Sequence, residues 1–320
     1  MERPAVRARG LVKRYGSVVA LDGVDLEVPP GETFGLLGPN GAGKTTTVKI
    51  LITLAQPDRG MAEVGGVDVV RDPVRARRLF GYVPQELTAD RSLTARESLR
   101  WFSDLYHLPR SGREARVAEA LRLVGLEEAA DRPTRTFSGG MKKKLDLACG
   151  LIHRPRILFL DEPSLGLDVK VRSDLWRHVA SLKASGVTVF LSTNYMDEAD
   201  RLCDRVAIID RGRIAVSGTP SELRAALGGD VVTLEAPQPD GEPLAPLAAP
   251  LSSLPFVKET RLHGSRLTVY VEANETAVPR ILELASRHGT SVHRISYSRP
   301  GLDEVFLKYT GHRFEDAPHD

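Results

Sequence analysis

The chain has 320 residues, enough for two domains at about 150 residues each. Hydrophobic residues make up 42% and charged residues 27% of it, which is typical of a folded globular protein and excludes the disordered and fibrous classes. Lysine and arginine exceed aspartate and glutamate by only 44 − 42 = 2, so the charge does not favour a nucleic acid as the main partner.

Strands and helices alternate along much of the chain. Short β-type runs at 6–12, 24–28 and 33–37 are separated by turns. Later apolar strands are expected at 156–160, 187–191 and 206–209. Helices are expected at 44–54, 169–183 and 195–203. This alternation predicts an α/β core with a parallel sheet covered by helices.

The stretch from 93 to 149 interrupts the alternation. Its apolar residues recur with helical spacing almost throughout, so we expect a helical subdomain inserted into the core. The core closes with Thr219, Pro220 and Glu222, which have the pattern of a helix N-cap, a first helical residue and a capping box. We therefore assign residues 1–229 to the first domain.

A smaller second domain is expected at residues 230–311. We predict a loop where proline recurs too often for regular structure, at Pro237, Pro239, Pro243, Pro246, Pro250 and Pro255. Beyond it, residues 267–271 alternate with a period of two, 278–285 have a helical pattern, and 292–297 read as a strand. These elements predict a small α+β fold, followed by a frayed tail at 312–320.

A phosphate-binding loop lies between the strand that ends at Leu37 and the helix that begins at Lys44. The pattern GxxxxGK[ST] is matched by Gly38, Pro39, Asn40, Gly41, Ala42, Gly43, Lys44 and Thr45. Backbone N–H groups of such a loop wrap the α- and β-phosphates, and the helix N-terminus adds partial positive charge. We expect Lys44 to reach the β- and γ-oxygens and the Thr45 hydroxyl to ligate Mg²⁺.

Two carboxylates follow the buried strand at 156–160. Open α/β sheets place their chemistry at the carboxyl ends of their strands, which is where Asp161 and Glu162 stand. Asp161 can hold magnesium or its water, and Glu162 can act as the general base for a water that attacks the γ-phosphate. Alone, such a pair is more often an ordinary loop start; the phosphate loop makes it a candidate catalytic pair.

A second phosphate-binding helix start is predicted at Ser138, Gly139 and Gly140. A serine and two glycines before a helix leave backbone N–H groups open, with no side chains in the way. By itself this motif would more often be a glycine loop with a serine N-cap. Together with the two motifs above, it favours phosphate binding.

The order and spacing of these motifs resemble those of ATP-binding-cassette (ABC) ATPases, which are P-loop NTPases, over residues 6 to about 227. The resemblance is carried by the phosphate loop, by Gln85 in Gly81-Tyr82-Val83-Pro84-Gln85, by Ser138-Gly139-Gly140, by Asp161-Glu162 and by residues 164–168. More narrowly, residues 195–200 and 300–308 are similar to the ATP-binding subunits of ABC-2-type exporters of the daunorubicin-resistance type.

The resemblance implies roles for further residues. Tyr15 would stack on adenine, and Thr46 would bind the nucleotide together with the phosphate loop. Gln85 would ligate magnesium and link it and the attacking water to a transmembrane partner. The Ser138 motif would bind the γ-phosphate held by the opposite subunit of a homodimer, and Asp168 would reach across that dimer.

The implied cofactors are ATP and Mg²⁺, and the implied partners are a second copy of the chain and an ABC-2-type permease. No run of about 18 uncharged apolar residues occurs, so we expect a peripheral subunit at the cytoplasmic face of the membrane. The cysteines, Cys149 and Cys203, are too few for a disulfide framework and are expected to be buried thiols.

Asn194 departs from the family pattern, which has a histidine in contact with the γ-phosphate. An amide can donate one hydrogen bond there, but unlike histidine it cannot take up an additional proton and become positively charged. Two hypotheses therefore stay open: an ATPase that powers efflux of a drug, lipid or polysaccharide, and an ATP-gated binding or regulatory module with negligible turnover. A nucleic-acid-associated cassette is disfavoured by the near-neutral charge and the lack of a coiled-coil arm.

Two clusters receive a non-functional interpretation. Lys142, Lys143 and Lys144 are expected on a solvated helix face. Four large apolar side chains recur at helical spacing: Trp101, Phe102, Leu105 and Tyr106. This spacing favours a position in the core over a partner-facing groove.

Overall fold

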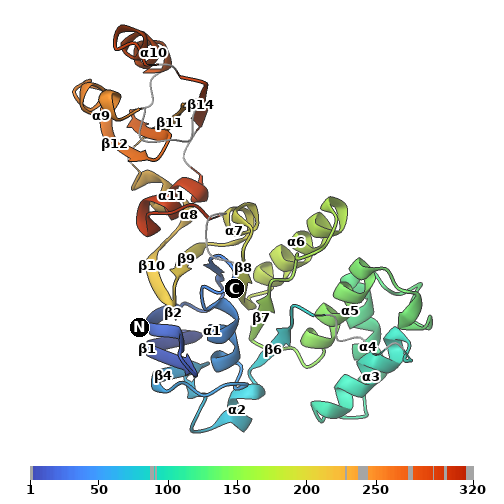
Figure 1. Cartoon of the computed structure of the whole chain (residues 1–320). Coiled ribbons are helices and arrows are strands. Elements are labelled where there is room, and N and C mark those ends of the chain that lie inside the picture. The colour runs from blue at the N-terminus through green and yellow to red at the C-terminus, as the bar shows by residue number, and fades with distance from the viewer. Residues whose placement is uncertain are drawn as a thin grey trace. The chain divides into compact units, whose positions relative to one another are not determined.

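The computed structural model describes residues 3–86, 90, 92–227, 229–236, 244–272, 277–290, 292–298 and 301–314. They form two compact units, one extending to Thr219 and the other from Pro220 to Phe314 (Figure 1). Helix α8 (Pro220–Ala225) lies in the second unit, not in the first domain as its sequence pattern predicts. The reason is its packing against α11 (Leu302–Thr310), where the Lys308 ammonium donates to the Ala226 carbonyl at 2.8 Å.

The first unit contains a six-stranded sheet in the order β10-β9-β3-β8-β7-β6. Its strands are β3 (Thr33–Leu37), β6 (Phe80–Val83), β7 (Ile157–Asp161), β8 (Thr188–Thr193), β9 (Arg205–Asp210) and β10 (Arg213–Gly218). All neighbouring strands are parallel except β9 and β10. β3, β7 and β8 are buried along their whole length, as strands covered on both faces must be, which confirms the predicted α/β core.

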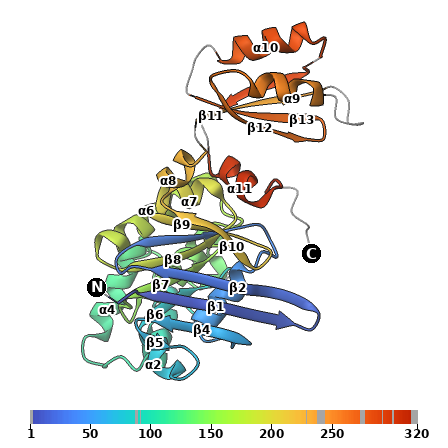
Figure 2. The same cartoon turned by 90° about the vertical axis from the view of Figure 1, so that its left-hand side faces the viewer.

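A second sheet of the same unit is antiparallel and has the order β2-β1-β4-β5 (Figure 2). It consists of β1 (Val6–Tyr15), β2 (Val18–Val28), β4 (Arg59–Val64) and β5 (Val67–Asp68). Helix α1 (Lys44–Leu51) buries Val48, Ile50 and Leu51 in a core that also contains apolar side chains from both sheets. This packing fixes the start of α1 relative to the ends of the parallel strands.

Three helices form the predicted helical insertion: α3 (Ala95–Leu105), α4 (Arg113–Val124) and α5 (Gly139–Leu151) (Figure 1). The remaining helical elements of this unit are α2 (Pro73–Arg77), the 3₁₀ turn η1 (Thr134–Thr136), α6 (Val169–Ala184) and α7 (Met196–Leu202). In the helical group, α4 packs against both α3 and α5.

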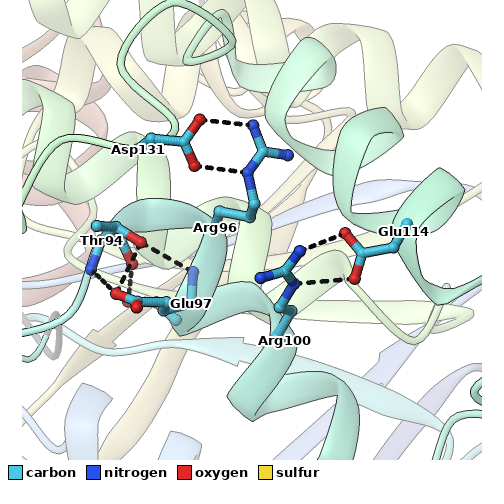
Figure 3. A network of polar contacts seen from close by, with 7 residues as sticks. Thr94, Arg96, Glu97, Arg100, Glu114 and Asp131 are labelled. Carbon is cyan, nitrogen blue, oxygen red and sulfur yellow. Dashed lines mark hydrogen bonds and ion pairs between the residues drawn. The ribbon is translucent and has the colours of Figure 1, made fainter.

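Polar contacts along α3 hold the helical group together (Figure 3). Thr94 caps α3 in a capping box with Glu97. Two bidentate pairs extend from the same helix, Arg96 with Asp131 and Arg100 with Glu114 of α4. Bidentate pairs fix orientation as well as distance, so the Arg100–Glu114 pair orients α3 relative to α4, and the Arg96–Asp131 pair joins α3 to the segment after α4.

The second unit is an antiparallel sheet in the order β12-β13-β11-β14, with helices α9 and α10 on one face (Figure 2). Besides α8 and α11, its elements are β11 (Asp230–Glu235), α9 (Ala245–Ser252), β12 (Val257–His263), β13 (Arg266–Val271), α10 (Ala277–Arg287) and β14 (Arg294–Ser298). Its hydrophobic core is separate from that of the first unit, which agrees with the predicted small α+β fold.

Two expectations about this unit are wrong. Pro246 and Pro250 lie in helix α9 rather than in a loop; Pro246 occupies the first turn, and burial of Leu247 and Leu251 holds the helix in place. Pro237, Pro239 and Pro243 lie outside the described residues. The predicted tail is ordered at its start, because the rings of His312 and Phe314 pack against Phe306, at 5.4 and 5.1 Å between centroids. Residues 315–320 are outside the described part.

Candidate active site

The phosphate loop connects β3 to α1 and has the backbone that its glycines allow. Gly41 and Gly43 have φ values of 76° and 106°, in the region that glycine favours. At Gly38, an added Cβ atom would lie 2.4 Å from the Ile209 carbonyl oxygen, so only glycine fits beside β9. The Lys44 ammonium donates to the carbonyls of Gly38 and Pro39 at 2.8 and 2.9 Å. The loop is therefore folded around its own lysine.

Asp161 and Glu162 lie at the carboxyl end of β7, beside the loop. The Lys44 ammonium is 3.0 Å from Glu162 Oε1, and both side chains are buried. Glu162 has a φ of 44°, a strained conformation for a residue with a side chain and one that occurs more often at functional sites. Its backbone N–H donates to Ser192 of the neighbouring strand β8.

A cavity of about 400 Å³ brings these groups together. The predicted site residues among its lining are Asn40, Gly41, Gly43, Lys44, Thr45, Thr46, Gln85, Glu162 and Asn194. Gly38, Pro39 and Ala42 complete the loop, and Asp161 is buried behind Glu162. The structure thus assembles, in one chain, the loop, both carboxylates, Gln85 and Asn194.

The electrostatics of Asp161 reflect its burial. Desolvation raises the pKa of this carboxyl above its usual value; the hydrogen bond donated by the Ser192 hydroxyl and the charge of Lys44 oppose the shift, and Glu162 adds to it. A cation bound near Asp161 would favour its ionised form. The Asn194 side-chain oxygen is also buried and has no hydrogen-bond partner among the described residues.

The Ser138 motif and Asp168 form a second group that does not line this cavity. Ser138 caps α5 by accepting from the Met141 N–H at 3.2 Å, and Asp168 caps α6 by accepting from the Val171 N–H at 2.9 Å. The two helix starts are in contact, because a Cβ atom added to Gly140 would lie 2.5 Å from Val171 Cγ1. Ser138, Gly139 and Asp168 are exposed.

Tyr15 is also outside the cavity lining. It ends β1, is 49% exposed and lies 5.3 Å, measured from its ring centroid, from the Lys13 ammonium. Its cross-strand partner Val18 does line the cavity. An exposed ring beside the cavity is compatible with the stacking role that the resemblance implies.

Two interpretations of the sequence are wrong at the residue level. Lys143 is not on a solvated face; it is buried, and its ammonium donates to the carbonyls of Pro84 and Gln85 at 2.6 and 3.2 Å. Trp101 and Leu105 are not in the core, since they are 54% and 53% exposed on α3. Helical spacing marks which residues share a face, but only the packing decides what covers that face.

Several residues that sequence reasoning missed support the site. Val18, Ala20 and Leu165 line the cavity. Ser192 contacts both carboxylate residues and stands directly after the predicted strand at 187–191, a position that could have identified it. Glu198 of α7 accepts hydrogen bonds from the Ser164 hydroxyl and, at 2.9 Å, from the Trp176 indole N–H, and nothing in the sequence pattern indicates this.

No helix in the described part of the chain is both long and apolar enough to cross a membrane. In the same residues, Cys149 and Cys203 are free and buried, as expected. Their burial raises the pKa of both thiols well above the usual value, which leaves them unreactive.

Comparison with known proteins agrees with this geometry. Residues 21–165 match the family described as "ABC transporter", and residues 218–310 match "ATP-binding protein DrrA1-3-like, C-terminal domain". The daunorubicin resistance ATP-binding protein DrrA2 of Streptomyces coeruleorubidus is 42% identical, over 99% of this chain and 98% of that protein.

Two solved structures illustrate the fold. An ATP-binding subunit of an ABC transporter is 33% identical, with a TM-score of 0.64 over 70% of this chain and 93% of its own. The bacterial ABC transporter cassette MJ0796, solved as a dimer, is 24% identical, with a TM-score of 0.62 over 67% of this chain and 98% of its own, and shows the fold alone. The chain therefore belongs to the ABC-transporter ATP-binding proteins, in the daunorubicin-resistance group, and is an ATP-binding and ATP-hydrolysing subunit of an ABC exporter.

Proposed function

We propose that the chain works as a homodimer that closes on two ATP molecules and powers an ABC-2-type permease from the cytoplasmic face of the membrane. The division of the site residues carries this proposal. One group surrounds Lys44 in a cavity, and the other, with Ser138 and Asp168, is exposed at the starts of α5 and α6 and does not line that cavity. A second copy would supply its Ser138 group to the nucleotide held at Lys44.

The residues of one copy carry the chemistry of water attack. The Lys44 ammonium donates to two carbonyls and pairs with Glu162. A bound phosphate offers this ammonium stronger, multiply charged acceptors, so the pair with Glu162 parts and the Glu162 carboxylate becomes available to accept a proton from water. The strained Glu162 backbone, tied to Ser192, keeps that carboxylate at the cavity wall.

Mg²⁺ fits the residues present. Thr45 and Gln85 line the cavity, and a nearby cation would favour the ionised form of the Asp161 carboxyl, whose pKa burial raises. These are oxygen ligands of the kind that Mg²⁺ prefers, with room for its own waters. When bound, the ion neutralises charge on the β- and γ-phosphates.

The membrane partner would contact the helical group on α3. Trp101 and Leu105 are large, exposed apolar side chains on this helix, and the Trp101 ring packs edge-to-face on Phe102 at 5.2 Å. Exposed apolar side chains that lie together on one helix mark interaction surfaces. The membrane subunit recognises the cargo. The name of the DrrA2 relative favours a drug as that cargo, over a lipid or polysaccharide.

Asn194 favours slow turnover by this ATPase, with ATP acting largely as a gate for binding or regulation. Its buried, unpartnered oxygen lies where the family has a histidine, and it cannot accept a hydrogen bond from an unprotonated phosphate. Steady-state phosphate release by the chain with its membrane partner measures this turnover, because each ATP hydrolysed releases one phosphate.

Sedimentation of Glu162→Gln tests the dimer. We expect this variant to bind ATP without hydrolysing it and to become dimeric only when ATP and Mg²⁺ are both present. Ser138→Arg in the same background should stay monomeric. If Glu162→Gln stays monomeric under all these conditions, also with the membrane partner, the homodimer proposal is wrong.

A further inference from the structure

Lys143 links α5 to the segment that carries Gln85. It lies in the second turn of α5, is only 4% exposed, and donates to the carbonyls of Pro84 and Gln85 at 2.6 and 3.2 Å. Its neighbours on the helix behave differently: Lys142 is partly exposed, and Lys144 pairs with Asp174 of α6 at 3.4 Å. Of the three lysines, Lys143 alone is buried.

Burial of this ammonium has to be offset by specific contacts. A buried charge is unfavourable unless hydrogen bonds and opposite charges replace its water. The two carbonyls supply the hydrogen bonds, and the carboxylates of Asp146, Asp161 and Glu198 supply negative charge. Desolvation outweighs those charges, so the pKa of the Lys143 ammonium is lower than usual. Breaking the two bonds would leave a poorly hydrated charge, which makes the link stiff.

A second attachment lies further along the same helix. A Cβ atom added to Gly81 of β6 would lie 2.0 Å from the Gly150 carbonyl oxygen of α5, and one added to Gly150 would lie 3.2 Å from Val83 Cγ2. The two glycines therefore let the backbone of α5 touch β6, the strand that leads into Gln85. The end of α5 is therefore fixed on the sheet at Gly150, whereas nearer its start Lys143 joins it to Pro84 and Gln85, beyond the end of β6, so the start of α5 can follow Gln85 while its end stays on the sheet.

The two groups that Lys143 joins, Gln85 and the start of α5, belong to different nucleotide sites. Gln85 lines the cavity of its own chain, whereas Ser138, at the start of α5, is exposed and does not. We propose that Lys143 is a positioning residue that couples the two ATP sites, because it makes any movement of Gln85 toward one nucleotide also move the Ser138 motif that serves the other. The pairing of the sites rests on the proposed homodimer; the link within one chain does not.

The coupling predicts a measurable motion inside a single chain. When Mg²⁺–ATP draws Gln85 inward, the helical group should shift relative to the core through Lys143. Spin labels can report this distance from cysteines introduced at two exposed positions, Leu54 after α1 and Leu123 on α4. The native cysteines are buried and will not take the label. A Ser138→Arg background keeps the chain monomeric, so that dimer formation does not contribute.

The test compares variants of Lys143 in the full-length chain. In the chain with native Lys143, we expect Mg²⁺–ATP to change the distance between the two spin labels. Lys143→Met should lose that change while its ATP affinity stays within about twofold of the native value. Lys143→Arg, which keeps the donors and the charge, should retain the change. Lys142→Met is the matched control on the same helix and should also retain it. A purely structural lysine would lower stability without removing an ATP-dependent shift from the folded protein.

Two results overturn the proposal. One is a folded Lys143→Met chain that shows the full ATP-induced change in spin-label distance. The other is a chain with native Lys143 that binds ATP and shows no change in that distance. If Lys143→Met does not fold, Lys143→Gln, which is shorter and uncharged, decides in the same way. Sedimentation of Glu162→Gln reports separately on the homodimer, so failure of the dimer and failure of the Lys143 link give different results.

Discussion

The cavity around Lys44 and the surface around Ser138 are built in opposite ways. Lys44, Asp161 and Glu162 are buried and held by one another or by neighbouring strands. Ser138 and Asp168 are exposed, and the contacts that their side chains make in the described part of the chain cap their own helices. A cavity lined by one chain can bind a nucleotide within that chain, whereas an exposed helix start needs something brought to it. Substitutions in the two regions should therefore separate nucleotide binding from turnover.

The largest effect is expected at Glu162. Loss of the general base in Glu162→Gln should lower the steady-state hydrolysis rate by about 10²- to 10⁴-fold. ATP affinity should not fall, because the glutamine no longer competes with phosphate for the Lys44 ammonium. Phosphate release and equilibrium ATP binding measure the two quantities. Glu119→Gln, which alters an exposed ion pair with Arg154, is the control. Equal rates for Glu162→Gln and the unaltered chain would exclude Glu162 as the base.

Ser138→Arg should separate binding from turnover most clearly. A bulky cation at the exposed start of α5 blocks approach of a second copy, so we expect hydrolysis to fall by about 10²-fold, as when a transition-state donor is removed. Nucleotide binding by the monomer should stay within about twofold. Ser111→Arg, another exposed serine of the helical group, is the matched control. Weaker ATP binding by the Ser138→Arg monomer would mean that the two regions are not independent.

A smaller effect, and a gain, is expected at Asn194. A charge-assisted hydrogen bond from histidine is worth roughly 1 kcal/mol more than a neutral one, so Asn194→His should hydrolyse ATP about fivefold faster. The rates should follow the order Asn194→His, unaltered chain, Glu162→Gln. Measurement at saturating ATP with the membrane partner decides. If Asn194→His is no faster than the unaltered chain, this position does not limit turnover.

The smallest effect, a nearly unchanged ATP affinity, is expected from removal of the second unit. It has its own hydrophobic core, and the described cavity is lined only by residues of the first unit. A chain that ends at Thr219 should therefore bind ATP with affinity within about twofold of the full chain. We expect the second unit to tune dimerisation or regulation instead. A well-folded truncated chain without ATP affinity would contradict this.

Patterns with a local physical cause were predicted correctly from the sequence. The phosphate loop could be identified because its glycines, lysine and threonine are consecutive and lie between a strand and a helix. Asp161 and Glu162 could be identified because a fully apolar run marks a buried strand, and the chemistry of a parallel sheet lies at its strand ends. The helical group and the small α+β unit follow from periodicity over many residues.

Features that depend on distant contacts were decided only by the tertiary structure. Lys143 was expected in solvent, because helical spacing cannot show that the carbonyls of Pro84 and Gln85 lie beside it. Pro246 and Pro250 were expected in a loop, but burial of Leu247 and Leu251 outweighs the helix-breaking tendency of proline. By itself the sequence determined which residues are candidates for binding and cleaving ATP. The packing decided how those groups are joined, because burial and hydrogen bonding depend on what the rest of the chain brings alongside.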